Sequence, residues 1–187
     1  MHVTGTTPYP WPYDGDLGGP GTALLVVLPV GIDPPEATEP VASAVRAAGG
    51  KVIVVRTTAP APGGHRLPGI PSEAAAGVAD LDLTAGGVDG FYASDLDLVL
   101  RTGRVRRLLL TGVGLETCVH STMRDANDRG YECLLVLDAC VPIDPSLVAA
   151  SVSSIEMSGG IFGAVGTSAA VIDALSTVPE PTAGALT

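Results

Sequence analysis

The chain has 187 residues, a formal net charge of −10 and a single lysine, Lys51, among ten basic residues. This length predicts one domain with a substantial core, and the acidic balance argues against binding to nucleic acid or to an anionic membrane. The N-terminal residues lack the basic and apolar regions of a signal peptide, and no apolar run is long enough to span a bilayer. The three cysteines, Cys118, Cys133 and Cys140, form no CxxC pair, so we expect a cytoplasmic protein with reduced thiols.

The order of the apolar runs predicts an α/β domain. Residues 1–22 are rich in Pro, Gly and Tyr and predict an extended arm, residues 23–178 form the domain, and residues 179–187 predict a flexible tail. Within the domain, apolar runs bounded by Gly and Pro indicate strands, and apolar residues at helical spacing indicate helices. The predicted strands are 23–28, 52–55, 81–83, 107–111, 132–137 and 161–165; the predicted helices are 39–48, 95–100, 118–129, 145–157 and 168–175; a loop rich in Pro and Gly covers 57–79.

Strands that are apolar throughout and alternate with helices are typical of a parallel sheet covered by helices on both faces. Such sheets carry their functional sites at the carboxyl ends of the strands. Lys51 directly precedes a strand, so we expect it at the opposite edge of the sheet.

The segment that leads to Cys118 is the sharpest local feature. Residues 108–120 read LLLTGVGLETCVH, which predicts a buried strand, a glycine turn and the start of a helix. A thiol in the first turn of a helix has a lowered pKa, and backbone N–H groups of the same turn, at Gly114 and Cys118, form a candidate oxyanion hole. The alternative is that Cys118 is a small buried apolar residue.

Several segments resemble one known family. TGVGLETCVHSTMRDANDRGYEC (111–133) and LDAC (137–140) resemble the signature of the isochorismatase-like cysteine hydrolases, closest to the branch of biuret and ureidoacrylate amidohydrolases. PWPYDGD (10–16), GFYASDL (90–96) and GGIFG (159–163) resemble further segments of that branch. The resemblance implies a doubly wound, Rossmann-like, three-layer α/β fold with a six-stranded, mostly parallel sheet, and a homo-oligomer that acts on a small molecule.

The same resemblance implies a mechanism in which Cys118 attacks an amide or ureido carbonyl. An aspartate that ends the first strand transfers the proton, a lysine supports the pair, and a cis peptide bond, here Val113–Gly114, shapes the oxyanion hole. In this chain the aspartate position is Leu28 and the lysine position is Ala85. The sequence therefore predicts a degenerate triad in which Cys118 is the surviving member.

Other polar residues are candidates to replace the missing groups or to contact a substrate. His65, Phe91 and Glu116 are candidate substrate contacts, and the candidate bases are Asp33, Asp82, Asp89, Glu116, His65 and His120. Each charged candidate has the alternative of a solvated surface charge, as does the arginine cluster Arg104, Arg106 and Arg107. The histidines supply no metal cluster and no nucleotide motif is present, so no cofactor is expected.

Two functions stay open from the sequence. The first is a repurposed cysteine-dependent enzyme that acts on a small carbonyl or amide molecule, including a non-hydrolytic step in a biosynthetic pathway. The second is a non-catalytic relative, either a pseudoenzyme that binds a ligand or a structural subunit. General acid–base catalysis is worth about 10²–10⁴ in rate, so without the aspartate and the lysine we expect ordinary amide hydrolysis to be badly impaired.

Overall fold

A computed structural model describes residues 1–58 and 79–177. Six parallel strands form one sheet in the order β3-β2-β1-β4-β5-β6. The strands are β1 (Thr22–Pro29), β2 (Lys51–Thr57), β3 (Leu81–Thr84), β4 (Arg107–Val113), β5 (Glu132–Val141) and β6 (Ala164–Gly166). The helices are α1 (Thr38–Ala47), α2 (Leu96–Thr102), α3 (His120–Asp128), α4 (Val148–Gly160) and α5 (Ser168–Ser176). The predicted α/β class and parallel sheet are confirmed.

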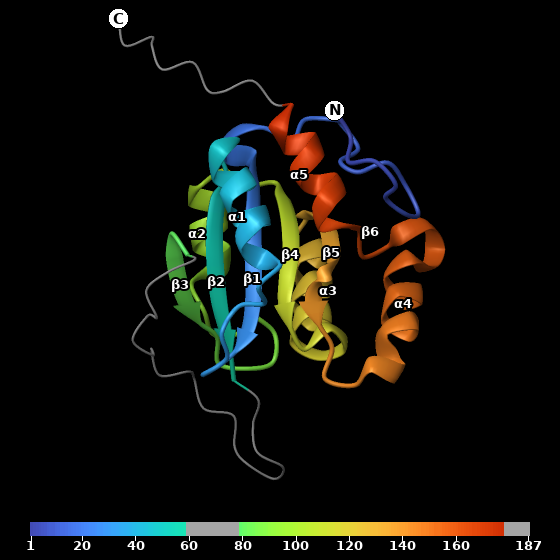
Figure 1. The fold of residues 1–187 in the computed structure, drawn as a ribbon. Coiled ribbons are helices and arrows are strands. Elements are labelled where there is room, and N and C mark those ends of the chain that lie inside the picture. Colours follow the sequence, from blue (N-terminus) through green and yellow to red (C-terminus); the bar gives the residue numbers. More distant parts are fainter. Residues whose placement is uncertain (59–78, 178–187) are drawn as a thin grey trace, which may run out of the picture.

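Helices cover both faces of the sheet, which makes three layers (Figure 1). On one face, α1 and α5 and the N-terminal arm pack against Leu24, Val26 and Leu28 of β1. On the other face, α2, α3 and α4 pack against Leu25 and Val27 of the same strand. Because side chains alternate along a strand, each core draws on every second residue of the central strands.

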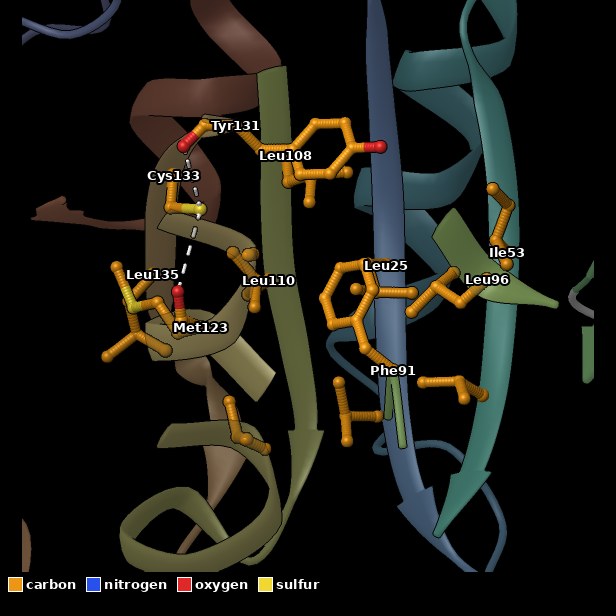
Figure 2. Packing of buried hydrophobic residues seen from close by; sticks show 14 of the residues in the cluster. Leu25, Ile53, Phe91, Leu96, Leu108, Leu110, Met123, Tyr131, Cys133 and Leu135 are labelled. Atoms are coloured by element: carbon orange, nitrogen blue, oxygen red, sulfur yellow. Dashed lines mark hydrogen bonds between the residues drawn. The ribbon is translucent and has the colours of Figure 1, made fainter. Parts of the chain in front are cut away.

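The second core contains Phe91 and Tyr131 together with Cys118. Figure 2 shows Phe91 and Leu96 beside Leu25, with Cys133 between the backbone carbonyls of Tyr131 and Met123. The Cys133 thiol donates to these two carbonyl oxygens at 3.6 and 4.0 Å. All three cysteines are free thiols and form no disulfide.

Several helices and strands begin or end at other residues than the sequence predicted. The last strand is not at 161–165 but at Ala164–Gly166, because Gly160 and Gly163 have φ values of 87° and 132° and the chain is still turning there. The helix expected from residue 118 is preceded by a wide π turn, Leu115–Val119, and α3 begins only at His120. Most of the loop predicted at 57–79, and the tail at 179–187, lie outside the described residues.

The N-terminal arm is folded against the domain. Val3 pairs with Trp11 and Thr7 pairs with Val165 in isolated bridges, and the Trp11 side chain is fully buried. The arm also contains a 3₁₀ turn, Gly19–Gly21, directly before β1. The arm therefore completes the core on the α5 face.

Lys51 is the first residue of β2 and is exposed. All strands run in the same direction, with their carboxyl ends at the lower edge in Figure 1. The prediction that Lys51 lies at the amino edge, opposite the Cys118 turn, is confirmed. Among the described helices, none is long and apolar enough to cross a membrane.

Candidate functional site around Cys118

A small cavity of about 230 Å³ lies at the carboxyl edge of the sheet and includes Cys118. Thr57 ends β2, Pro29 ends β1, and these two residues are partners in the sheet register. The complete lining of described residues is Pro29, Thr57, Val88, Thr117, Cys118 and Ile143. None of these described side chains is charged, and the surface that they present to the cavity is mostly apolar.

The turn between β4 and α3 fixes the thiol in this cavity. Gly114 adopts φ 84° and ψ 55°, a left-handed conformation that glycine reaches without steric cost. A Cβ at Gly114 would lie 2.6 Å from Thr117 Oγ1 and 2.9 Å from Cys118 Sγ. The Val113–Gly114 bond is not cis, since the cis bonds among the described residues are Thr7–Pro8 and Trp11–Pro12. The prediction of a cis bond there is therefore wrong: the chain turns through the left-handed conformation of Gly114 instead.

The Cys118 side chain is buried. It belongs to the core with 3% exposure, and Sγ donates to the Val113 carbonyl oxygen at 2.9 Å. Burial raises the pKa of Cys118, although hydrogen bonds from the hydroxyls of Thr57 and Thr117 and from the amides of Val119 and Cys118 act to lower it. The expectation of a lowered pKa is therefore wrong, because desolvation outweighs the donors.

The candidate oxyanion hole is partly occupied. The Gly114 amide donates to the Val141 carbonyl oxygen at 2.8 Å, which continues the pairing of β4 with β5. Because that N–H group already has an acceptor, an oxyanion at this turn would depend on other donors. The amides of Cys118 and Val119 are the ones within reach of Sγ.

The two replaced triad positions lie in different cores. Ala85 is fully buried in the same core as Cys118, where its amide donates to the Arg56 carbonyl oxygen at 2.8 Å. Leu28 is fully buried in the opposite core, with Leu24 and Val26. At the end of β1 it is Pro29, not Leu28, that borders the cavity.

Glu116 acts within the protein rather than toward the cavity. Its carboxylate accepts hydrogen bonds from the amides of Ile143 (3.1 Å) and Asp144 (2.5 Å). Partial burial alone would raise the pKa of Glu116, but these amides and its own amide lower it. The carboxylate therefore fixes the loop that presents Ile143 to the cavity.

Asp82, Asp33 and Phe91 are not among the described residues that line the Cys118 cavity. Asp82 pairs with Arg56 at 3.1 Å, and both side chains are 8% exposed; Arg56 neighbours Leu28 in the register, on the strand next to it. Asp33 is exposed. Phe91 is a core residue beneath the Arg129 guanidinium, whose carbon lies 4.8 Å from the ring centroid. His65 lies outside the described residues.

Two titratable candidates have shifted pKa values. Burial, followed by the charge of Arg124, lowers the pKa of His120, and its buried Nε2 has no hydrogen-bond partner among the described residues. Burial raises the pKa of Asp89 to about 6, with the carboxylate of Asp125 adding to the effect. Neither residue lines the cavity, and within the described ranges no group of three His, Cys, Asp or Glu side chains could hold a metal ion.

Thr57 lines the Cys118 cavity, although the sequence did not single it out. It is buried, its hydroxyl donates to the Leu28 carbonyl oxygen at 3.3 Å, and it also reaches the Cys118 sulfur. The available signal was its place as a polar residue at the carboxyl end of an apolar strand, which is where parallel sheets build their sites.

Comparison with known proteins shows the family of this chain. The family model for the isochorismatase domain matches residues 31–170. The ureidoacrylate amidohydrolase RutB of Methylobacterium radiotolerans is 38% identical over 97 residues, which cover 51% of this chain and 36% of that protein. The RutB of Caulobacter vibrioides CB 15 is 38% identical over 81 residues, or 43% and 35% of the two chains. The chain thus spans about a third of the length of the curated relatives it matches.

Solved structures extend the likeness to most of the chain. A cysteine hydrolase from Pseudomonas syringae superposes with a TM-score of 0.67 and 22% identity over 86% of this chain and 94% of that one. The N-carbamoylsarcosine amidase of Thermoplasma acidophilum gives a TM-score of 0.54 and 25% identity over 79% and 96%. An isochorismatase family protein from Burkholderia thailandensis gives 0.64 and 24% over 85% and 97%.

Proposed function

Because the chain belongs to the isochorismatase family, we propose that its Cys118 cavity binds a small, neutral, largely apolar molecule and does not hydrolyse an amide. The observation that carries this proposal is that the described residues around this cavity of about 230 Å³ are all uncharged, with Pro29, Val88 and Ile143 as its apolar part. Burying a charged group there would be costly without a partner. A neutral ligand of a few heavy atoms meets no such penalty.

The state of the thiol supports binding over hydrolysis. Hydrolysis by a cysteine needs a thiolate to attack the carbonyl and an acid to protonate the leaving nitrogen. Here burial raises the pKa of Cys118. The positions that would carry the proton-transfer acid and the lysine, Leu28 and Ala85, are fully buried apolar residues.

The binding test compares two probes of nearly equal shape and different charge, isobutyramide and isobutyrate. Backbone amide NMR shifts of Thr57, Val88 and Thr117 report on the cavity. We expect saturable shifts with isobutyramide and none with isobutyrate at the same concentration. Equal binding of both probes, or no response to either, refutes the proposal.

The hydrolysis test uses ureidoacrylate, the molecule in the name of the relatives with RutB activity. We expect no ammonia release beyond that of the Cys118→Ala variant. Turnover that disappears in Cys118→Ala would show that the chain is a hydrolase after all.

A second function is favoured by one specific observation, the four donors around the sulfur. The Thr57 and Thr117 hydroxyls and the Cys118 and Val119 amides all favour the thiolate. They would support a cysteine-dependent, non-hydrolytic step on a small carbonyl compound. The pH dependence of Cys118 alkylation by iodoacetamide separates the two functions: a thiolate that forms well below pH ~8.5 favours the enzyme, and a silent thiol favours the binding protein.

We also propose that the protein works in the cytoplasm as a homo-oligomer. The three free thiols support a reducing compartment. Sedimentation of the purified chain tests the oligomer, and a monomer at micromolar concentration would contradict it.

A further inference from the structure

We propose a second binding site, for the phosphate group of a small organic phosphate, at the amino edge of the sheet. A cavity of about 670 Å³ lies there, between the arm before β1 and the turn from α2 to β4. Its basic lining residues are Arg101, Arg104 and Arg106, and its acidic one is Asp16. β1 and β4 begin at this edge, the upper one in Figure 1, whereas Cys118 follows the opposite ends of the strands.

The charge of this cavity is the reverse of that of the whole chain. Asp and Glu number 20 and Lys and Arg number 10, yet arginines outnumber acids in the lining. The carboxylate of Asp16 also already pairs with Arg107, which lies outside the lining. Asp16 accepts a hydrogen bond from the buried Arg107 at 3.0 Å, and its contact with Arg106 is longer, at 3.6 Å between exposed side chains. An exposed pair of that kind contributes little, so Arg106 can turn to a ligand.

Arg104 is the strongest reason to expect an anion. Its side chain is exposed, and within the described part of the chain it makes no hydrogen bond or ion pair. Its backbone has φ 57°, a conformation that glycine would adopt more easily. Arg101 is held by Asp97, from which its Nε lies 2.9 Å away.

The backbone of the turn is firmly fixed. The amide of Arg104 donates to the Arg101 carbonyl oxygen at 3.0 Å, and that of Val105 to the Leu100 carbonyl oxygen at 2.9 Å. The amide of Arg106 donates to the Gly21 carbonyl oxygen at 2.9 Å, which ties the turn to the residues before β1. The guanidinium groups of Arg104 and Arg106 are thus carried by a hydrogen-bonded turn on one rim of the cavity.

The chemistry of the lining selects the class of ligand. Planar guanidinium forks match the oxygens of phosphate and bind them through charge-assisted hydrogen bonds. Pro20 and the buried Val105 add an apolar wall, and the volume exceeds what inorganic phosphate needs. An organic phosphate monoester uses both features.

The test titrates the intact protein with phenyl phosphate, followed by calorimetry and by backbone NMR. We expect saturable binding that weakens as salt rises, with amide shifts at Gly18, Gly19 and Gly21 and at residues 103–106. Arg104→Gln replaces an exposed guanidinium that has no partner among the described residues, so the fold should stay intact. The variant should bind phenyl phosphate about tenfold more weakly, as the loss of a hydrogen bond to a charged group predicts. The Arg106→Gln variant acts in the same direction.

Lys51→Gln is the matched control, since Lys51 is an exposed cation at the same edge and does not line this cavity. It should leave binding unchanged. The proposal is overturned by an absence of saturable binding at millimolar phenyl phosphate, by an equal loss in Lys51→Gln, or by shifts confined to the Cys118 cavity. Tighter binding of benzoate than of phenyl phosphate would overturn the choice of phosphate.

Discussion

Replacing Thr57 with valine is expected to raise the pKa of Cys118 further. The hydroxyl of Thr57 has one proton, which it donates to the Leu28 carbonyl oxygen at 3.3 Å while the sulfur is a thiol. When the thiolate forms, the hydroxyl can rotate and donate to the sulfur, and this interaction lowers the pKa. Valine keeps the branched shape and removes that donor.

The size of the effect follows from the exchange of one hydrogen bond for another. A hydrogen bond to a charged acceptor is worth about 1.5–3 kcal/mol and a neutral one about 1 kcal/mol. The net stabilisation of the thiolate by Thr57 is then about 1 kcal/mol, which corresponds to about a fivefold change in an equilibrium constant. Below the pKa, the alkylation rate of Cys118 should fall about fivefold in Thr57→Val.

The assay follows iodoacetamide labelling of each cysteine by mass spectrometry between pH 6 and 10. Cys133 and Cys140 serve as internal controls, because burial raises the pKa of both, that of Cys140 to about 12. Thr58→Val is the matched variant, since its hydroxyl donates to the Ala85 carbonyl oxygen at 3.0 Å instead. An unchanged Cys118 profile in Thr57→Val, or an equal change in Thr58→Val, would refute the reasoning.

Three further predictions concern stability. Gly112→Ala should prevent folding or cost more than about 4 kcal/mol, because its Cβ would lie 1.9 Å from the Val27 carbonyl oxygen; a normal urea midpoint would contradict this. Asp82→Asn should cost about 3 kcal/mol in urea, because it leaves Arg56 buried beside a neutral group; a loss below about 1 kcal/mol would mean that the pair is solvated. Asp89 has a folded pKa of about 6 against 3.8, so the folded state binds more protons and stability falls as pH rises from about 4 to 6. Asp89→Asn should therefore be more stable than the native chain at pH 7 and lose that advantage below pH 4 in urea titrations, whereas a gain at every pH would argue against titration.

The sheet was predictable because its strands are long apolar runs with clear stops. β1, β2 and β4 are buried along nearly their whole length, and a strand of this kind has few competing interpretations. Because these strands are apolar along nearly their whole length, the sequence does not show which face of the sheet each residue lies on. Leu28 follows Val26 and Leu24 into the core under α1, but a strand that is apolar on both sides has no alternation from which to tell this. The resemblance to the family aligns Leu28 with an aspartate, and only the pleat shows that Pro29 borders the cavity.

Two opposing effects act on the pKa of Cys118: burial raises it and hydrogen-bond donors lower it. The sequence around the cysteine reveals only part of them. Thr117 and the amides of the turn are neighbours along the chain, so the donors that favour a thiolate are visible in the residues around the cysteine. The hydroxyl of Thr57 belongs to β2, and the burial of the thiol depends on the packing of β1 against β2 and β4. No pattern in the residues next to Cys118 encodes either of them. Since burial is the larger effect on the pKa of Cys118, the local pattern predicted a shift of the opposite sign. The turn before Cys118 can therefore be recognised from the sequence, but the direction of its pKa shift depends on how deeply the neighbouring strands bury the thiol.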